Sequence, residues 1–248
     1  MKLCLAATYA KGKAFNFDLK SLNYVLESFY YIKPWQTEQI NNVEFFLLDS
    51  GAFTFLNKKS SNIDIIDYVD RYADYIKQNN IEYYFELDID SLIGYSEVKK
   101  IRQRLERKTK NKCIPVWHKS RGIKEFKNLC KKYDYVSIGG IATKEITSGE
   151  YFLLNSFCDY AHSQNCKIHG LGFTPCDLSN YRFDSVDSTS WIYGGKFGKR
   201  NIFSNGKMST TYPNERLHYL EHDKYNLKQW LLYQEFLKGV NYMNVNSE

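Results

Sequence analysis

Hydrophobic and polar positions follow two patterns that alternate along the chain. Short apolar runs predict β-strands at residues 2–7, 44–49, 83–88, 113–118, 135–139, 167–172 and 183–187. Residues 200–204 are a candidate for an eighth strand. Between the runs, apolar residues recur at spacings of three and four, as in the stripe of Ile63, Ile66, Val69, Ala73 and Ile76, which is typical of amphipathic helices. Since parallel strands need long crossovers, this alternation predicts an α/β fold with a parallel sheet.

Polar or glycine residues repeatedly stand where an apolar run stops. These positions are Asp49, Asp88, His118, Gly139, Gly140, His169, Gly170 and Asp187. An open sheet also fits the alternation, but neither GxGxxG nor a P-loop follows the first strand. In a closed barrel, all of these strand ends meet at one rim, where active sites are built. We therefore expect one (β/α)8 TIM-type barrel over residues 1–240 and a flexible tail at 241–248.

The composition agrees with a single globular domain. The chain has 248 residues, of which 43% are hydrophobic and 25% charged. Its six cysteines form no CxxC pair, which argues against a zinc knuckle and favours a reducing, cytoplasmic compartment. We find no signal peptide and no apolar run of about eighteen residues, so we expect no membrane association. The net charge of +6 permits a nucleic-acid partner without requiring one.

The acidic strand ends also admit a metal-binding interpretation. A divalent-metal hydrolase could use Asp49, Asp88, Asp90, His118 and His169. However, no predicted strand carries an HxH or HxxE pair, and a single Asp after a strand is often only a turn or helix-capping residue. We expect no metal and no cofactor, and we interpret the polar strand ends together as one site.

Five segments resemble the tRNA-guanine transglycosylase superfamily when taken in order. They are LLDSGAF (47–53), IPVWH (114–118), VSIGGIA (136–142), IHGLGFT (168–174) and VDSTSW (186–191). The set is most similar to short phage-type proteins related to the enzymes that place 7-deazaguanines in DNA. For a phage-encoded chain, the expected compartment is the host cytoplasm. The resemblance covers residues 47 to about 198, and the segments around Asp49 and Asp187 are its most specific parts.

The resemblance implies a (β/α)8 barrel that exchanges guanine for a 7-deazaguanine through a covalent aspartyl–sugar intermediate. Asp187 matches the nucleophile of the family, with Asp184 as a nearby competitor, and Asp49 matches the proton-transfer residue. Phe53 stands where an aromatic ring covers the base, and Asp88 where a carboxylate accepts hydrogen bonds from its edge. The other residues expected to contact the base are Ser50, Gly51, His118, Gly139, Gly140, His169 and Gly170.

The chain departs from the family by lacking the zinc subdomain that helps larger members bind tRNA. DNA is therefore the more favoured polynucleotide, and a free 7-deazaguanine base such as preQ0 is the expected co-substrate. Basic residues that follow the proposed nucleophile, Lys196, Lys199 and Arg200, are candidates to bind phosphate. Two alternatives stay open: an inactive nucleic-acid or nucleotide-binding barrel, and a metal-dependent barrel hydrolase. The sequence leaves the oligomeric state undetermined.

Overall fold

Eight parallel strands form one sheet in the computed structural model, which describes residues 1–10, 19–51, 64–194, 197–213 and 218–240. They are β1 (Lys2–Ala6), β2 (Tyr24–Ser28), β3 (Phe45–Asp49), β4 (Tyr83–Tyr84), β5 (Val116–Trp117), β6 (Tyr135–Ile138), β7 (Lys167–Gly170) and β8 (Ser185–Ser188). Their order is β4-β3-β2-β1-β8-β7-β6-β5, so strands that follow one another in sequence lie side by side except β4 and β5, which are outermost, and β8 lies beside β1. This arrangement confirms the prediction of a parallel α/β fold.

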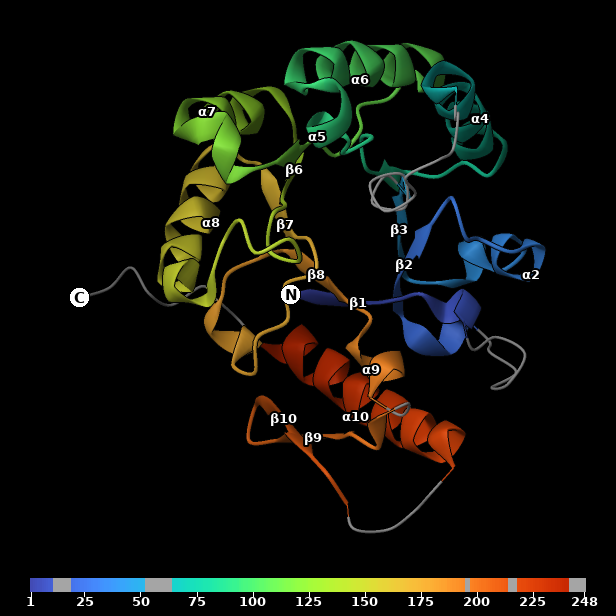
Figure 1. Cartoon of the computed structure of the whole chain (residues 1–248), viewed down its shortest axis with the longest axis vertical. Helices are drawn as coiled ribbons and strands as arrows, with labels where there is room; N and C mark the ends of the chain where they lie inside the picture. Colours follow the sequence, from blue (N-terminus) through green and yellow to red (C-terminus); the bar gives the residue numbers. More distant parts are fainter. Residues whose placement is uncertain (11–18, 52–63, 195–196, 214–217, 241–248) are drawn as a thin grey trace.

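The sheet is strongly curled, and helices surround it (Figure 1). Its two outermost strands are linked just beyond their ends by an isolated parallel bridge between Phe85 and Ile114. The N–H of Glu86 donates to the carbonyl of Ile114 at 3.0 Å, and the N–H of Ile114 donates to that of Tyr84 at 2.8 Å. The chain segments that continue β4 and precede β5 therefore lie side by side.

The α-helices lie outside the sheet, mostly between successive strands. They are α2 (Pro34–Thr37), α4 (Ile65–Gln78), α5 (Asp90–Ile93), α6 (Tyr95–Thr109), α7 (Gly122–Lys132), α8 (Leu154–Ser163), α9 (Ser190–Tyr193) and α10 (Tyr219–Gly239). Short 3-10 helices occur at Thr8–Ala10, Leu19–Leu22, Ile40–Asn42, Lys119–Arg121, Ser148–Leu153 and Leu178–Asn180. Within α4, the predicted positions Val69, Ala73 and Ile76 are buried, whereas Ile66 is exposed.

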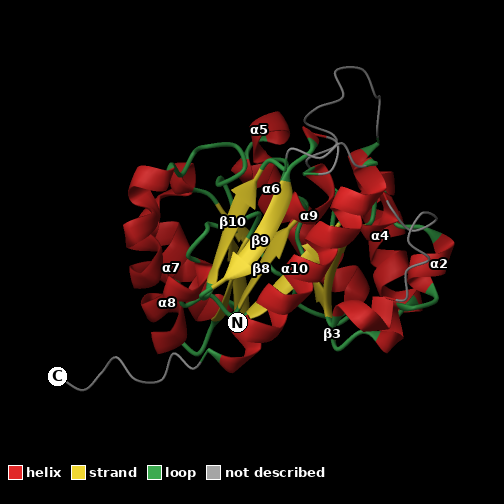
Figure 2. Ribbon diagram, turned by 90° about the horizontal axis from the view of Figure 1, so that it is seen from below, coloured by secondary structure: helices red, strands yellow, loops and turns green. Residues whose placement is uncertain are grey.

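The eighth strand was predicted in the wrong place. Residues 200–204 do form a strand, β9 (Arg200–Ser204), but it pairs antiparallel with β10 (Lys207–Thr211) outside the main sheet. The turn between them is Asn205-Gly206, both with positive φ, which is the usual chemistry of a tight hairpin. In Figure 2 this hairpin lies against α10. The strand that belongs in the sheet is β2, whose buried Glu27 interrupts the apolar pattern.

Alternate residues of the strands face two different cores, as the period of two in a strand requires. One set points into the curl of the sheet and comprises Cys4, Ala6, Tyr24, Leu26, Leu47, Phe85, Ile114, Val116 and Tyr135. The other set packs against the helices and includes Leu3, Leu5, Val25, Leu48, Val136 and Ile168. This packing fixes which side chains of each strand can reach the inside of the sheet.

Candidate active site

A cavity of about 740 Å³ opens at the carboxyl ends of the strands. We call it the carboxyl-end cavity; the residues that line it include Tyr9, Tyr31, Asp49, Gly51, Asp88, Asp90, His118, Gly140, Glu145, Gly172, Asp187 and Thr189. The three acids expected to act together, Asp49, Asp88 and Asp187, all belong to this lining. The structure therefore places strand ends that are distant in sequence around one space.

Asp49 ends β3 and is held by the turn that follows it. Its Oδ2 accepts a hydrogen bond from the N–H of Gly51 at 2.9 Å. Gly51 has φ of +77°, and a Cβ there would lie 2.6 Å from the Cβ of Tyr30, so this turn requires glycine. Burial raises the pKa of Asp49 to about 6; the Gly51 hydrogen bond opposes this rise, and the charges of Asp187 and Asp88 add to it. Asp49 can therefore give and take a proton near neutral pH.

Asp187 lies on β8 and is 8% exposed, with its side chain at the cavity wall. Its Oδ1 accepts the N–H of Gly172 at 2.6 Å and lies 3.2 Å from Nε2 of His169. Within the described part of the chain, no hydrogen bond reaches its other oxygen, Oδ2. One carboxylate oxygen is thus fixed and the other is available to a ligand.

Asp88 is part of a dense network of charges on one wall of the cavity. Nε2 of His118 lies 2.7 Å from Oδ2 of Asp88, and Nδ1 of His118 lies 2.9 Å from Oε2 of Glu145. Burial alone would lower the pKa of His118, but the hydrogen bond and charge of Asp88, with help from Glu145, raise it to about 9. His118 is therefore positively charged at neutral pH and donates to both acids.

Arg121 completes this network from the buried side. Its Nη2 lies 3.2 Å from Asp88 and 2.9 Å from Asp90, and its Nη1 lies 3.3 Å from Glu86. The guanidinium also stacks on the ring of Tyr95, 4.2 Å from the ring centroid. Its side chain is 2% exposed, so these ion pairs are screened little by water.

The same residues provide the one grouping of metal-ligand type found in the described segments. Ligand atoms of Asp88, Asp90 and His118 lie within 4.8 Å of one another. Arg121 already supplies positive charge to both aspartates, and protonated His118 has no lone pair to offer. These residues therefore fit an internal ion-pair network better than a divalent cation.

We expect Arg121→Gln to destabilise the fold by about 3–5 kcal/mol, because it removes one positive partner from fully buried Glu86 and from partly buried Asp88 and Asp90. Chemical denaturation measures this loss. The matched control is Arg104→Gln, which removes an Arg–Asp70 pair of 2.7 Å between partly exposed side chains on α6 and α4. That variant should lose much less stability, because water screens exposed pairs. Equal losses in the two variants would contradict a structural role for the buried network.

Four of the expected base contacts lie behind the cavity instead of lining it. The N–H of Gly139 donates to Trp117 within the sheet at 2.8 Å, and a Cβ on Gly170 would approach Phe173 to 3.0 Å. Ser50 and His169 are buried, and neither belongs to the cavity wall. Gly51, His118 and Gly140 do line it.

The remaining expectations concern Phe53 and the basic residues. Phe53 and Lys196 lie outside the described residues, as does the tail at 241–248. Lys199 immediately precedes the β9–β10 hairpin and Arg200 begins it; neither lines the cavity. Hydrogen bonds from Lys199 to Gly194 and from Asn226 to Lys199 attach the start of the hairpin to α9 and α10.

Several cavity residues were not expected from the sequence. Glu145 stands in a loop without any motif, and it lines the cavity beside Gly140, where a Cβ would lie 2.8 Å from its Oε2. Tyr9 and Tyr31 stack at a centroid distance of 4.8 Å and an angle of 11°, and both line the cavity. With 21 tyrosines in the chain, residue type alone could not single these two out.

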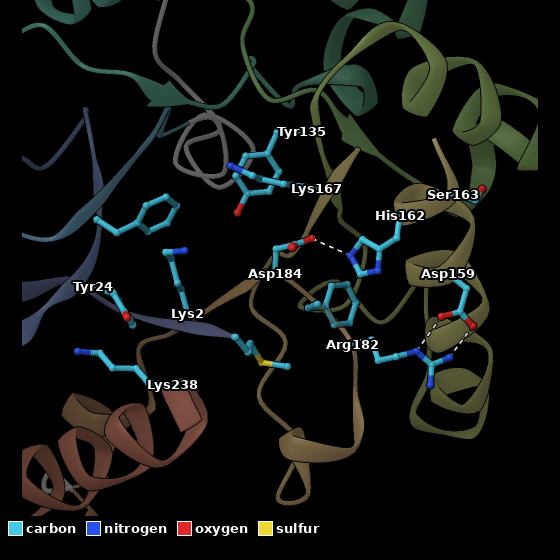
Figure 3. Close-up of a pocket in the computed structure, with 13 residues that line it drawn as sticks. Lys2, Tyr24, Tyr135, Asp159, His162, Ser163, Lys167, Arg182, Asp184 and Lys238 are labelled. Carbon is cyan, nitrogen blue, oxygen red and sulfur yellow. Dashed lines mark hydrogen bonds and ion pairs between the residues drawn. The ribbon is translucent and has the colours of Figure 1, made fainter. Parts of the chain in front are cut away.

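A second cavity, of about 1050 Å³, lies at the amino ends of the strands. Figure 3 shows this amino-end cavity with Lys2, Lys167, Tyr135 and Asp184 around it. Asp184 Oδ2 is 2.9 Å from Nε2 of His162. Asp184 thus lines the amino-end cavity, whereas Asp187 and Asp49 line the carboxyl-end cavity.

Comparison of the chain with models of protein families finds no match, and a search of curated protein sequences finds none either. Among the helices that the structure describes, none combines the length and the apolar character needed to cross a membrane.

Proposed function

We propose that this chain is a nucleobase transglycosylase that exchanges guanine for a 7-deazaguanine in a polynucleotide. We also propose that its curled sheet closes into a (β/α)8 barrel between β4 and β5. The bridge between Phe85 and Ile114 supports closure, since it joins the segments next to the two outermost strands. A closed barrel presents its active site at the carboxyl ends of its strands, where the cavity lies.

The observation that carries the proposal is a pair of carboxyl groups with different roles in one cavity. Asp187 has one oxygen held and one available, and Asp49 titrates at about 6. As the glycosidic bond breaks, its electron pair passes to the base and Oδ2 of Asp187 bonds to C1′ of the sugar. Asp49 gives its proton to the departing base. The incoming base loses a proton to Asp49, attacks C1′ and releases Asp187.

The cavity has the dimensions and chemistry that a flat base needs. Its volume falls within the range of roughly 300–1,000 Å³ that is usual for small-ligand sites. The Tyr9–Tyr31 stack offers an aromatic face. Gly140 lines the cavity, and its missing side chain leaves room for Glu145, another residue of the lining. Asp88 retains lone pairs for the edge of a base even while His118 and Arg121 donate to it.

Basic and aromatic residues at the ends of the β9–β10 hairpin and on α10 support a polynucleotide partner. The ammonium of Lys199 lies 5.7 Å from the ring centroid of Tyr212, and the guanidinium of Arg200 lies 5.1 Å from that of Tyr225. Such pairs suit phosphates and stacked bases. The hydrogen bond from Lys199 to Gly194 attaches the start of the hairpin to the end of α9, the helix that follows β8 and its Asp187. DNA is our first choice of polynucleotide, with free preQ0 as the co-substrate and no metal in the reaction.

The test is incorporation of radiolabelled guanine and preQ0 into DNA and tRNA, measured side by side. Incorporation into either polymer, unchanged by a metal chelator, is the expected result. Oligonucleotide binding without incorporation would favour the alternative of an inactive binding barrel. One observation favours that alternative: His118 and Arg121 already donate to the carboxylate of Asp88.

A further inference from the structure

A continuous chain of hydrogen-bonding groups crosses the inside of the sheet behind Asp187. The hydroxyls of Tyr135 and Ser185 are 2.5 Å apart, and Ser185 Oγ is 2.5 Å from Nδ1 of His169. Nε2 of His169 then lies 3.2 Å from Oδ1 of Asp187. Ser185 and His169 are fully buried. These hydrogen bonds therefore connect Asp187, at the wall of the carboxyl-end cavity, to Tyr135 through buried groups.

Strand geometry places these groups together. His169 and Ser185 are register partners on β7 and β8, and Asp187 points to the same side as Ser185 because it is two residues further along β8. Tyr135 reaches Ser185 from the start of β6 and lines the amino-end cavity (Figure 3). The inside of the sheet is thus polar along β6–β8, whereas the other strands contribute mainly apolar side chains there.

A single direction of donation runs through these hydrogen-bonded groups when Asp187 is ionised and His169 is neutral. An ionised Asp187 can only accept, so Nε2 of His169 must carry the proton that it donates. Nδ1 of a neutral imidazole then accepts, and the hydroxyl of Ser185 donates to it. The oxygen of Ser185 in turn accepts from Tyr135, whose phenol stays protonated because burial raises its pKa well above the usual range. Each proton along the chain is used once.

We propose that His169 is a positioning residue, held by Ser185 and Tyr135 in the neutral Nε2–H tautomer, which fixes Oδ1 of Asp187. Gly172 donates to the same oxygen at 2.6 Å. Two donors on Oδ1 leave Oδ2 as the atom that attacks the sugar and set the orientation of the carboxylate. The nucleophilic role rests on the proposed function, whereas the tautomer and the hydrogen-bonded chain do not.

Nuclear magnetic resonance tests the chain independently of activity. The ¹⁵N shifts of the five imidazoles distinguish the two neutral tautomers from the charged form, and His169→Gln assigns the signal of His169. The expected result is a neutral Nε2–H imidazole at pH 7 that becomes a mixture of tautomers in Ser185→Ala. A charged or Nδ1–H imidazole in the unmodified protein would overturn the proposal.

Kinetics test the effect on Asp187. His169→Leu should slow single-turnover adduct formation with a guanine-containing oligonucleotide by about 10–100-fold, with KM nearly unchanged. His169→Gln should recover most of the rate, because its amide can donate to Asp187 and accept from Ser185.

The control is Ser137→Ala, which removes a buried hydroxyl that donates to the carbonyl of His169 at 3.3 Å. This hydroxyl is not part of the hydrogen-bonded series from Tyr135 to Asp187. Its rate should equal that of the unmodified protein. An unchanged rate in His169→Leu would refute the positioning role. If the unmodified protein forms no adduct, the proposed function fails while the tautomer measurement still decides the hydrogen-bonded chain.

Discussion

Asp187→Asn is expected to abolish the covalent adduct with a guanine-containing oligonucleotide, lowering its rate of formation by on the order of 10⁴ or more. The physical reason is that an amide cannot supply the negatively charged oxygen that bonds to C1′. The fold should survive, because the amide oxygen can still accept from Gly172 and His169, the two donors to Oδ1. A denaturing gel that separates free from protein-linked oligonucleotide measures the outcome.

Asp184→Asn is the matched control for this experiment. Asp184 is three residues earlier in the chain but lies at the amino-end cavity, where it pairs with His162 and accepts the N–H of Ile168 at 2.7 Å. Its replacement should leave the adduct intact, since the amino-end cavity lies at the opposite end of the sheet from the proposed site of reaction. Adduct retained in Asp187→Asn, or lost only in Asp184→Asn, would reverse our assignment of the nucleophile.

The strand ends could be predicted from the sequence because, at each of them, a run of apolar residues is ended by a polar residue. An apolar run followed by an acid marks the position of Asp49 on β3 and of Asp187 on β8, and parallel strands bring such positions to one edge. β2 could not be predicted in this way. Its Glu27 is buried, and its Oε1 accepts hydrogen bonds from the backbone and hydroxyl of Thr8, a contact that only the folded chain creates.

The supporting residues of the site escaped prediction for the same reason. Arg121 ends a short 3-10 helix and Glu145 stands in a loop, and their partners Asp88 and His118 are about 30 residues away in sequence, so spacing carries no information about the network. His169 was expected to touch the base. It instead points into the sheet because β7 alternates, and its position relative to Asp187 depends on the register of β7 and β8. The sequence pattern therefore located the strand ends, and packing decided which side chains face the cavity.

Under the proposed mechanism, Asp49 acts as the acid in one half-reaction and as the base in the other, so the two should respond to pH in opposite directions. Its pKa of about 6 means that the protonated form falls about tenfold for each pH unit above 6. Release of guanine with adduct formation should therefore slow as pH rises from 6 to 8. Attack of the incoming base on the adduct should quicken as pH rises through 6 and then level off. Rapid-quench measurement of each step separately tests this.

Asp49→Asn is expected to stop exchange yet stabilise the fold at pH 8. The pKa of Asp49 is raised by folding from an ordinary 3.8 to about 6, so its favourable contribution is complete below about pH 4 and is lost as pH rises through 6. A neutral amide avoids that loss, which corresponds to about 2–3 kcal/mol at pH 8. Denaturation at pH 4 and pH 8 checks the sign, because the stabilisation should appear only at the higher pH. Removing the charge raises the free energy of unfolding only where folding disfavours the ionised carboxylate. A variant that loses exchange and is also less stable at pH 8 would therefore mean that Asp49 is an ordinary structural acid.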